Sequence, residues 1–120
     1  SGTNFAIWQK GNAGVEPVPV TIYLNPWEWA KDSAWFAVYA YGNGETWYKM
    51  IDSDGDGIYE CEIDSKYSKV IFTRNNPDKT DLNWDSKWNQ TVDLTIPTDG
   101  KNCFTINSWD GKSTGVWSKK

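Results

Sequence analysis

The amino-acid sequence predicts an all-β fold, an antiparallel β-sandwich of the immunoglobulin-like type with about eight strands. Three observations support this prediction. Short runs rich in β-branched and aromatic residues recur along the chain, turn residues separate them at intervals of about 8–12 residues, and no segment has the periodicity of a long amphipathic helix. The expected strands cover residues 20–24, 34–41, 46–51, 57–63, 69–74, 91–96 and 102–106.

Glycine-rich turns are the clearest breaks between these strands. Residues 42–44 read Gly-Asn-Gly and residues 54–57 read Asp-Gly-Asp-Gly, and these residue types accept the backbone angles of tight hairpins at low cost. A chain of 120 residues fits one domain. We therefore expect the sandwich over residues 20–120, preceded at residues 1–19 by an extended lead-in or an edge strand.

Aromatic residues are unusually frequent. The chain contains nine Trp, six Tyr and four Phe. Each such side chain carries roughly 150–250 Å² of surface, which is more in total than the core of a small domain can hide. Because exposed rings on a soluble protein usually mark a recognition surface, the composition predicts a binding face.

Net charge and cysteine usage exclude several kinds of ligand. The formal charge is −4 and Arg74 is the only arginine, so the surface has the wrong sign for a phosphate backbone. No apolar run approaches the length of about 20 residues that spans a bilayer, and no signal peptide opens the chain. Cys61 and Cys103 stand alone and histidine is absent, which argues against a zinc site. One disulfide and two buried free thiols both remain open.

The predicted strand at 34–41 shows which rings face outward. Side chains alternate along a strand, so Tyr39 and Tyr41 share one face, and the opposite face carries the expected core residues Phe36, Val38 and Ala40. The hairpin then returns Trp47 beside Tyr41. Three adjacent rings form a platform suited to sugars, whose C–H faces stack on aromatic rings while their hydroxyls bind polar groups. The alternative is that the two tyrosines simply pack beneath a loop.

Several motifs in this order resemble a known family. They are Tyr-x-Tyr at 39–41, Trp47, Asp-Gly-Asp-Gly-Ile-Tyr at 54–59, Lys-Val-Ile-Phe at 69–72 and Gln-Thr-x-Asp-Leu at 90–94. Together they resemble carbohydrate-binding modules of family 26, the starch-binding modules attached to bacterial amylases and gut-bacterial surface proteins, over about residues 20–106.

The resemblance implies a β-sandwich without catalytic activity or cofactor that binds maltose-type α-1,4-glucan. It implies a binding site made of Tyr39, Tyr41 and Trp47, with Gln90 as a polar contact. It also implies an extracellular or bacterial cell-surface location and attachment to other modules of a larger protein.

The segment 75–87 departs from the family pattern because it is longer. It brings Trp84 and Trp88 into the neighbourhood of the expected site, where they extend the platform, cap it or change its specificity. Further tryptophans that the family does not explain offer a second contact surface: Trp27, Trp29 and Trp35. Two alternatives therefore accompany α-glucan binding, namely a module for another glycan and a protein-interaction or spacer domain.

Some motifs resemble catalytic or metal sites without their full chemistry. Asp52, Asp54 and Asp56 open like a calcium loop, but Ile63 stands at the twelfth position, and we favour a tight acidic turn. Residues 111–115 match Gly-x-Ser-x-Gly, yet a serine hydrolase needs a histidine base. A glycosidase needs a deep cleft beside its carboxylates, which short turns do not build. We therefore predict neither a metal site nor an enzyme.

Overall fold

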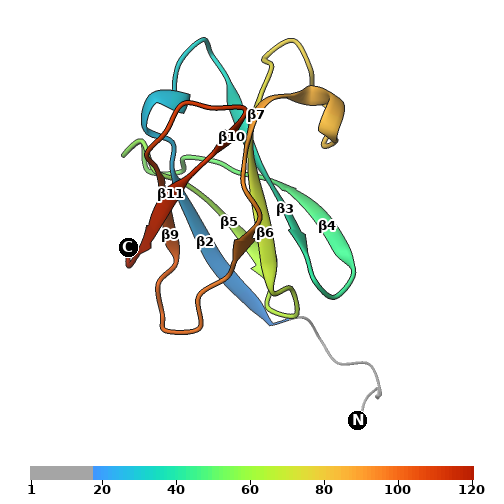
Figure 1. The fold of residues 1–120 in the computed structure, drawn as a ribbon, viewed down its shortest axis with the longest axis vertical. Helices are drawn as coiled ribbons and strands as arrows, with labels where there is room; N and C mark the ends of the chain where they lie inside the picture. Colours follow the sequence, from blue (N-terminus) through green and yellow to red (C-terminus); the bar gives the residue numbers. More distant parts are fainter. Residues whose placement is uncertain (1–17) are drawn as a thin grey trace.

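Two β-sheets containing ten strands make up the fold in the computed structural model, which describes residues 18–120 (Figure 1). The first sheet has six strands: β3 (Trp35–Tyr41), β4 (Glu45–Lys49), β6 (Lys69–Asn75), β7 (Lys87–Thr91), β8 (Leu94–Thr95) and β10 (Lys112–Ser113). The second sheet has four: β2 (Pro19–Asn25), β5 (Tyr59–Asp64), β9 (Cys103–Ile106) and β11 (Gly115–Ser118). The predicted all-β sandwich is confirmed. The predicted lead-in or edge strand falls almost entirely outside the described residues.

The sheets are mixed, whereas the sequence predicted antiparallel pairing throughout. Most neighbours are antiparallel, but β10 pairs with β7 and β9 pairs with β2 in parallel. The predicted strand at 91–96 is divided, since β7 ends at Thr91 and the short β8 begins at Leu94. Strands β10 and β11 were not predicted, because a Gly- and Ser-containing tail has no strand pattern of its own and is ordered by pairing with β7 and β9.

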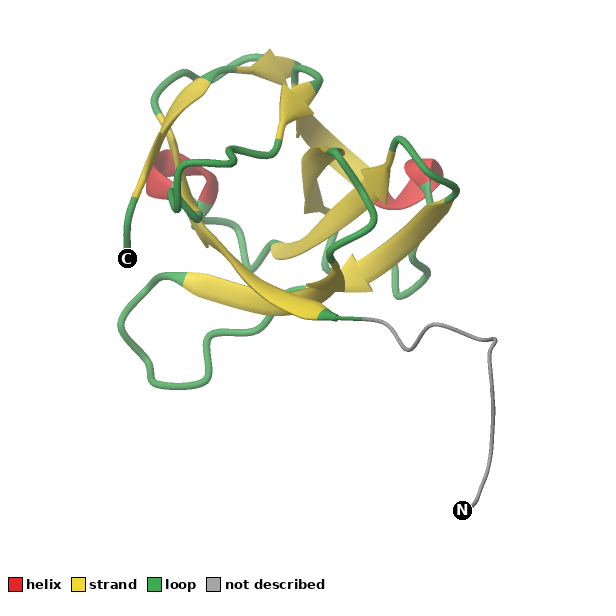
Figure 2. Ribbon diagram, turned by 90° about the horizontal axis from the view of Figure 1, so that it is seen from below, coloured by secondary structure: helices red, strands yellow, loops and turns green. Residues whose placement is uncertain are grey.

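The core lies between the two sheets, and Figure 2 shows the strands surrounding it from below. Phe36, Val38 and Ala40 face this core as the alternation predicted. Phe72 of the first sheet stacks on Phe104 of the second, with ring centroids 5.7 Å apart. These contacts hold the two layers together by burying apolar area from both inner faces.

Two short 3-10 helices, η1 (Trp27–Trp29) and η2 (Trp84–Ser86), lie in the connections. Trp29 in η1 is fully buried and stacks on Phe36, so the prediction that it belongs to a contact surface is wrong. Its neighbour Trp27 is 47 % exposed. No helix within residues 18–120 has the length and apolar character needed to cross a membrane.

The two cysteines are free thiols. Cys61 pairs with Ile22 on one side of β2, and Cys103 pairs with Tyr23 on the other. A strand therefore separates them, at a Cα separation of roughly twice the interstrand spacing of about 4.8 Å, which is beyond the reach of a disulfide. Of the two alternatives left open by the sequence, free thiols are found, with Cys103 buried and Cys61 half-buried.

Candidate functional site

The outer face of the six-stranded sheet brings the predicted aromatic residues together. Strand β3 directs Tyr39 and Tyr41 outward, and the β3–β4 hairpin places Trp47 directly opposite Tyr39. Gly42 at the turn has φ +103°, and a Cβ added there would lie 2.2 Å from the Ser68 hydroxyl. The turn therefore requires glycine, and it fixes the register that sets Trp47 beside Tyr39.

Four rings form a continuous cluster on this face, with Tyr39 at its centre. The ring centroid of Tyr39 lies 5.3 Å from that of Tyr41, 5.0 Å from that of Trp47 and 5.0 Å from that of Trp84. Trp47 and Trp84 also contact each other at 4.7 Å. We call these four residues the aromatic platform. Trp84 is 39 % exposed, and the other three are half-buried.

Hydroxyl groups give the platform a polar edge. The Tyr39 hydroxyl donates a hydrogen bond to Glu45, and this bond, more than burial, raises the pKa of Tyr39. Burial is the main cause that raises the pKa of Tyr41, with the Asp93 carboxylate adding to it. Both phenols therefore remain protonated at neutral pH and carry O–H donors. The sequence reasoning missed Glu45, although period-two alternation from Trp47 places it on the same face.

The β6–β7 loop, residues 76–86, carries Trp84 onto the platform. The Trp35 indole Nε1 donates to the carbonyl oxygens of Asn76 and Lys79, both at 3.0 Å. Asn83 caps η2 by accepting from the Ser86 amide at 3.1 Å. In Figure 1 this loop leaves the upper end of β6 and returns through η2 into β7. Trp35 thus anchors the loop, and η2 presents Trp84 to the rings.

The centre of the outer face is buried. Ala37, Thr73 and Asn75 point away from the core by strand alternation, yet all three have no exposed surface. Ile71, which is paired with Tyr39, is 7 % exposed. Within the described residues, no hydrogen-bond partner is found for the Thr73 hydroxyl or for the side-chain amide of Asn75. The outer face therefore contains a buried layer with unpaired polar groups.

Gln90 lies on the same outer face, two strands away from β3. It pairs with Thr73 across β6 and β7 and is half-buried. Its side-chain amide makes one long contact, 3.5 Å from Nε2 to the Thr91 carbonyl oxygen. Gln90 is thus a neighbour of the covered polar groups and does not contact the four rings directly.

Trp88 lies away from the platform, in a second aromatic cluster. The pairing register of β6 and β7 shifts between Arg74 and Asn75, so Trp88 does not follow the regular in-out alternation of its strand. The Trp88 ring stacks on the Arg74 guanidinium, whose central carbon lies 4.8 Å from the ring centroid. Trp109 stacks on the same guanidinium, also at 4.8 Å. We call Arg74, Trp88 and Trp109 the Arg74 cluster. The predicted site residues are therefore divided between two places.

Arg74 is buried at 3 % exposure, and its donors are almost fully used. They bind four acceptors: the Trp29 carbonyl oxygen at 2.8 Å, the Lys31 carbonyl oxygen at 3.0 Å, Asn89 Oδ1 at 3.2 Å and Asp32 Oδ2 at 2.9 Å. These bonds join η1 and the chain after it to β6 and β7. The cluster thus has a structural role at this end of the sandwich.

The acidic turn at 52–57 uses its carboxylates to hold its own backbone. Asp52 accepts from the amides of Asp56 and Gly57, and Asp56 accepts from the amide of Ile58 at 2.9 Å. Carboxylate oxygens of Asp52, Asp54 and Asp56 lie within 4.8 Å of one another, the spacing that a cation site would need. The hydrogen bonds fit the tight acidic turn favoured by the sequence.

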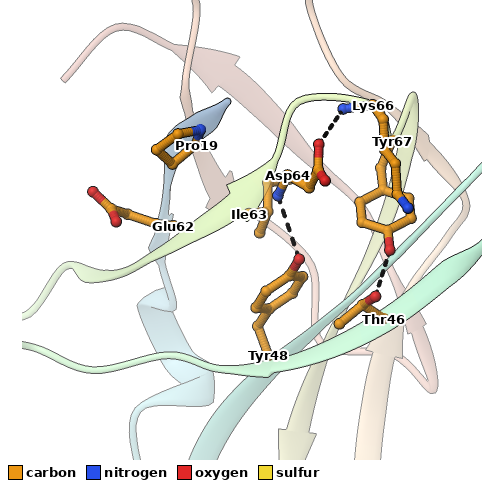
Figure 3. Close-up of a pocket in the computed structure, with 8 residues that line it drawn as sticks. All are labelled: Pro19, Thr46, Tyr48, Glu62, Ile63, Asp64, Lys66 and Tyr67. Carbon is orange, nitrogen blue, oxygen red and sulfur yellow. Dashed lines mark hydrogen bonds between the residues drawn. The ribbon is translucent and has the colours of Figure 1, made fainter. Parts of the chain in front are cut away.

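A surface hollow of about 440 Å³ lies at the open edge of the sandwich between β4 and β5 (Figure 3). Its polar groups bind one another: the Asp64 amide donates to the Tyr48 hydroxyl at 3.3 Å, and Thr46 and Tyr67 share a hydrogen bond. These groups need no ligand to satisfy them. The platform, whose four rings are partly exposed on the outer sheet face, is the better candidate site.

Comparison of the chain with models of known protein families, with curated proteins and with solved structures finds no match.

Proposed function

We propose that this protein is a non-catalytic carbohydrate-binding module that stacks starch-type α-1,4-glucan on the aromatic platform. The single observation that carries this proposal is the continuous contact of Tyr39, Tyr41, Trp47 and Trp84 on one sheet face. A sugar ring offers axial C–H groups to such a surface, and its equatorial hydroxyls meet the Tyr39 hydroxyl and Glu45 at the edge.

The tilt of the ring planes favours a wound glucan chain over a flat one. Tyr39 lies at 26° to Tyr41 and at 49° to Trp47, and Trp84 stands at 71° to Trp47. The surface is therefore curved. An α-1,4-linked chain curves as it extends and can follow these planes, whereas a straight β-linked chain contacts only one or two of them.

A binding role also fits the position of the platform better than catalysis does. Glycosidases hold the scissile bond between two carboxyl groups in a walled cleft. The platform lies on an outer sheet face, and Glu45 beside it is already engaged by the Tyr39 hydroxyl. We extend the proposal to an extracellular or bacterial cell-surface protein, in which several tethered modules raise a modest affinity through avidity.

Native electrophoresis through gels containing amylopectin tests the proposal. We expect strong retardation of the parent protein, relative to gels without polysaccharide, and its reversal by free maltoheptaose. Glycogen and amylose gels extend the test to other α-1,4-glucans. Unretarded migration in all three would overturn the proposal.

A module for another glycan is the second candidate, and Trp84 favours it. Trp84 stands at 61° to Tyr39, so it forms a wall beside the other three rings of the platform and narrows the space for the ligand. A glycan array separates the two candidates. Preference for α-1,4-linked oligosaccharides supports the first, and preference for a β-linked polymer supports the second.

A further inference from the structure

A polar hollow lies at the edge of the six-stranded sheet that is remote from Trp47. Its volume is about 330 Å³, and its lining residues are Gln90, Thr91, Val92, Asp93 and Lys112. Strands β7 and β10 lie side by side at this edge (Figure 1). Lys112 pairs with Gln90, so strand geometry places both side chains on the outer face, which also carries the platform.

Tyr41 and Asp93 connect the platform to this hollow. Tyr41 belongs to β3, and Asp93 lies in the chain between β7 and β8. The Tyr41 hydroxyl is buried, and the Asp93 carboxylate lies close enough to this phenol for its charge to raise the Tyr41 pKa. Because β6 separates β3 from β7 and β8, the Tyr41 ring extends across β6 toward Asp93. Asp93 therefore stands both at the end of the platform and at the rim of the hollow.

The hollow carries the polar groups that bind sugar hydroxyls. The Asp93 carboxylate accepts hydrogen bonds, the Lys112 ammonium donates them, and the Gln90 amide does both. Asp93 and Lys112 are both exposed and have opposite charges. An anionic ligand is repelled by the first and a cationic ligand by the second, whereas a neutral polyol binds to both. The volume is at the lower end of the range of about 300–1,000 Å³ for ligand pockets and suits one sugar unit.

The width of the sheet decides which ligands reach the hollow. Strands β3 and β10 are separated by three interstrand spacings of about 4.8 Å, or about 14 Å in all. A disaccharide that stacks on Tyr39 and Trp47 occupies the platform alone. A longer chain that runs over Tyr41 continues across β6 and arrives at Asp93.

We propose that Asp93, Gln90 and Lys112 form a polar subsite for a neutral sugar unit that follows the units stacked on the platform, so that the protein binds long α-glucan chains in preference to short ones. This inference rests on the proposed function. The platform contributes stacking on ring faces, and the subsite contributes hydrogen bonds to hydroxyl groups. The two contributions add only in a ligand long enough to contact both.

Titration calorimetry of the Lys112→Met variant with maltose and with maltoheptaose tests the subsite. The substitution keeps the aliphatic stem of an exposed side chain on the short edge strand β10, so the fold should be retained. We expect the affinity for maltoheptaose to fall about three- to tenfold, the effect of one lost hydrogen bond. The affinity for maltose should change by less than about twofold, because Lys112 lies beyond its reach.

Asp93→Asn is the second variant, and it keeps the shape of the side chain while removing its charge. It should weaken maltoheptaose binding more than maltose binding. Lys101→Met and Asp99→Asn are the charge-matched controls, because these two residues form an exposed ion pair in the connection between β8 and β9. Each control should change the affinity for maltoheptaose by less than about twofold.

The side chain of Gln90 provides a readout in the unaltered protein. The chain contains only two glutamines, Gln9 and Gln90, so the side-chain amide signals of Gln90 are readily assigned in a ¹H–¹⁵N spectrum. Saturating maltoheptaose should shift these signals, because a sugar hydroxyl then binds the amide. Saturating maltose should leave them in place.

The outcomes distinguish this inference from the proposed function. If the parent protein binds neither ligand, the proposed function fails and the subsite with it. If the parent binds both ligands but Lys112→Met and Asp93→Asn behave like the two controls, and the Gln90 signals stay in place at saturation, the function stands and the subsite is overturned. Equal weakening of maltose and maltoheptaose binding in both variants would also overturn the subsite, since the two residues would then act through the platform.

Discussion

The aromatic platform and the Arg74 cluster both contain exposed tryptophan, but their rings have different neighbours. In the platform each ring contacts other rings, and Tyr39 alone meets three. In the Arg74 cluster, Trp88 and Trp109, each 42 % exposed, stack on a guanidinium that is itself buried. The first arrangement leaves ring surface on an open face, and the second uses ring surface to shield a charge from water.

This difference teaches that exposure alone does not identify a ligand-binding tryptophan. Trp84 and Trp88 have nearly the same exposed fraction and lie four residues apart in the sequence. The cation–π contact of Trp88 with Arg74 explains its position, because this contact stabilises the buried charge. For Trp84, the only such contacts found among the described residues are with the rings of Tyr39 and Trp47. We therefore place Trp84 in the proposed glycan site and give Trp88 a structural role.

The largest expected effect comes from removing the charge at the centre of the Arg74 cluster. Arg74→Met leaves Asp32 and the carbonyl oxygens of Trp29 and Lys31 without their donor. Because Asp32 is 64 % exposed, the main cost comes from the buried acceptors, the Trp29 carbonyl oxygen and Asn89 Oδ1. We expect the free energy of unfolding to fall by about 2–4 kcal/mol in chemical denaturation. Arg74→Lys keeps the positive charge but lacks the planar set of guanidinium N–H donors, so its loss of stability should be only partly smaller than that of Arg74→Met. A decrease below about 1 kcal/mol would contradict the structural role.

The next largest effect is on α-glucan affinity, and substitutions in the two regions should affect it differently. Trp47→Ala should weaken α-glucan binding by about 1–3 kcal/mol, because a stacking ring is lost, while folding is retained. Tyr39→Ala and Tyr41→Ala should act in the same direction. Calorimetric titration with maltoheptaose and thermal denaturation measure the two properties.

Trp88→Ala is the matched control for Trp47→Ala. It should reduce stability by about 1–2 kcal/mol, through the lost cation–π contact and packing, and leave glucan affinity unchanged. The opposite pattern, with binding lost in Trp88→Ala and kept in Trp47→Ala, would place the glycan site at the Arg74 cluster.

A smaller effect is expected at the anchor of the β6–β7 loop. Trp35→Phe keeps an aromatic side chain but removes the donor that binds Asn76 and Lys79. We expect a loss of about 1 kcal/mol in stability and faster amide hydrogen exchange in residues 76–86. Amides of the Arg74 cluster serve as the internal control and should exchange at the parent rate.

The smallest effect concerns the tyrosine hydroxyls of the platform. The pKa values of Tyr39 and Tyr41 are raised in the folded protein, so folding favours their neutral forms. This contribution to stability is fully present below the unfolded tyrosine pKa of about 10 and is lost as the pH rises through the raised folded values. Glucan affinity should therefore stay constant from neutral pH to about pH 9 and decline above pH 10.

Ultraviolet titration of tyrosinate checks the assignment. In Tyr39→Phe and Tyr41→Phe variants, the component that titrates last should decrease. If either variant instead removes a component that titrates at or below the ordinary tyrosine pKa, the environment described for that phenol is wrong.

The fold and the centre of the platform could be predicted because both follow from local pattern. Period-two alternation in residues 34–41 and a glycine turn at 42–44 are enough to place Tyr39, Tyr41 and Trp47 together. The expectation that Trp84 lies near the site came instead from the family resemblance, because segment 75–87 is longer than the family pattern at that place. The placement of the other three rings needed no information from distant parts of the chain.

The rest depended on contacts that no local pattern encodes. The place of Trp88 was set by a register shift against β6, and Thr73 and Asn75 are fully buried although they lie on the outward face of the sheet. From strand alternation alone, these two residues would be expected to face solvent. Likewise, Arg74 was visible in the sequence as a lone arginine, but its four acceptors come from η1, from the chain after it and from β7.

The β6–β7 loop is closed at its base, where the Asn76 amide donates to the Ser86 carbonyl oxygen at 2.8 Å. Entry and exit of the loop are thereby fixed to each other as well as to the sheet. A segment of this kind can be shortened, lengthened or exchanged with little disturbance to the strands that carry it. The residues between its ends are thus a place where sequence changes can alter the surface beside the platform, in evolution or in design, without disturbing the sheet.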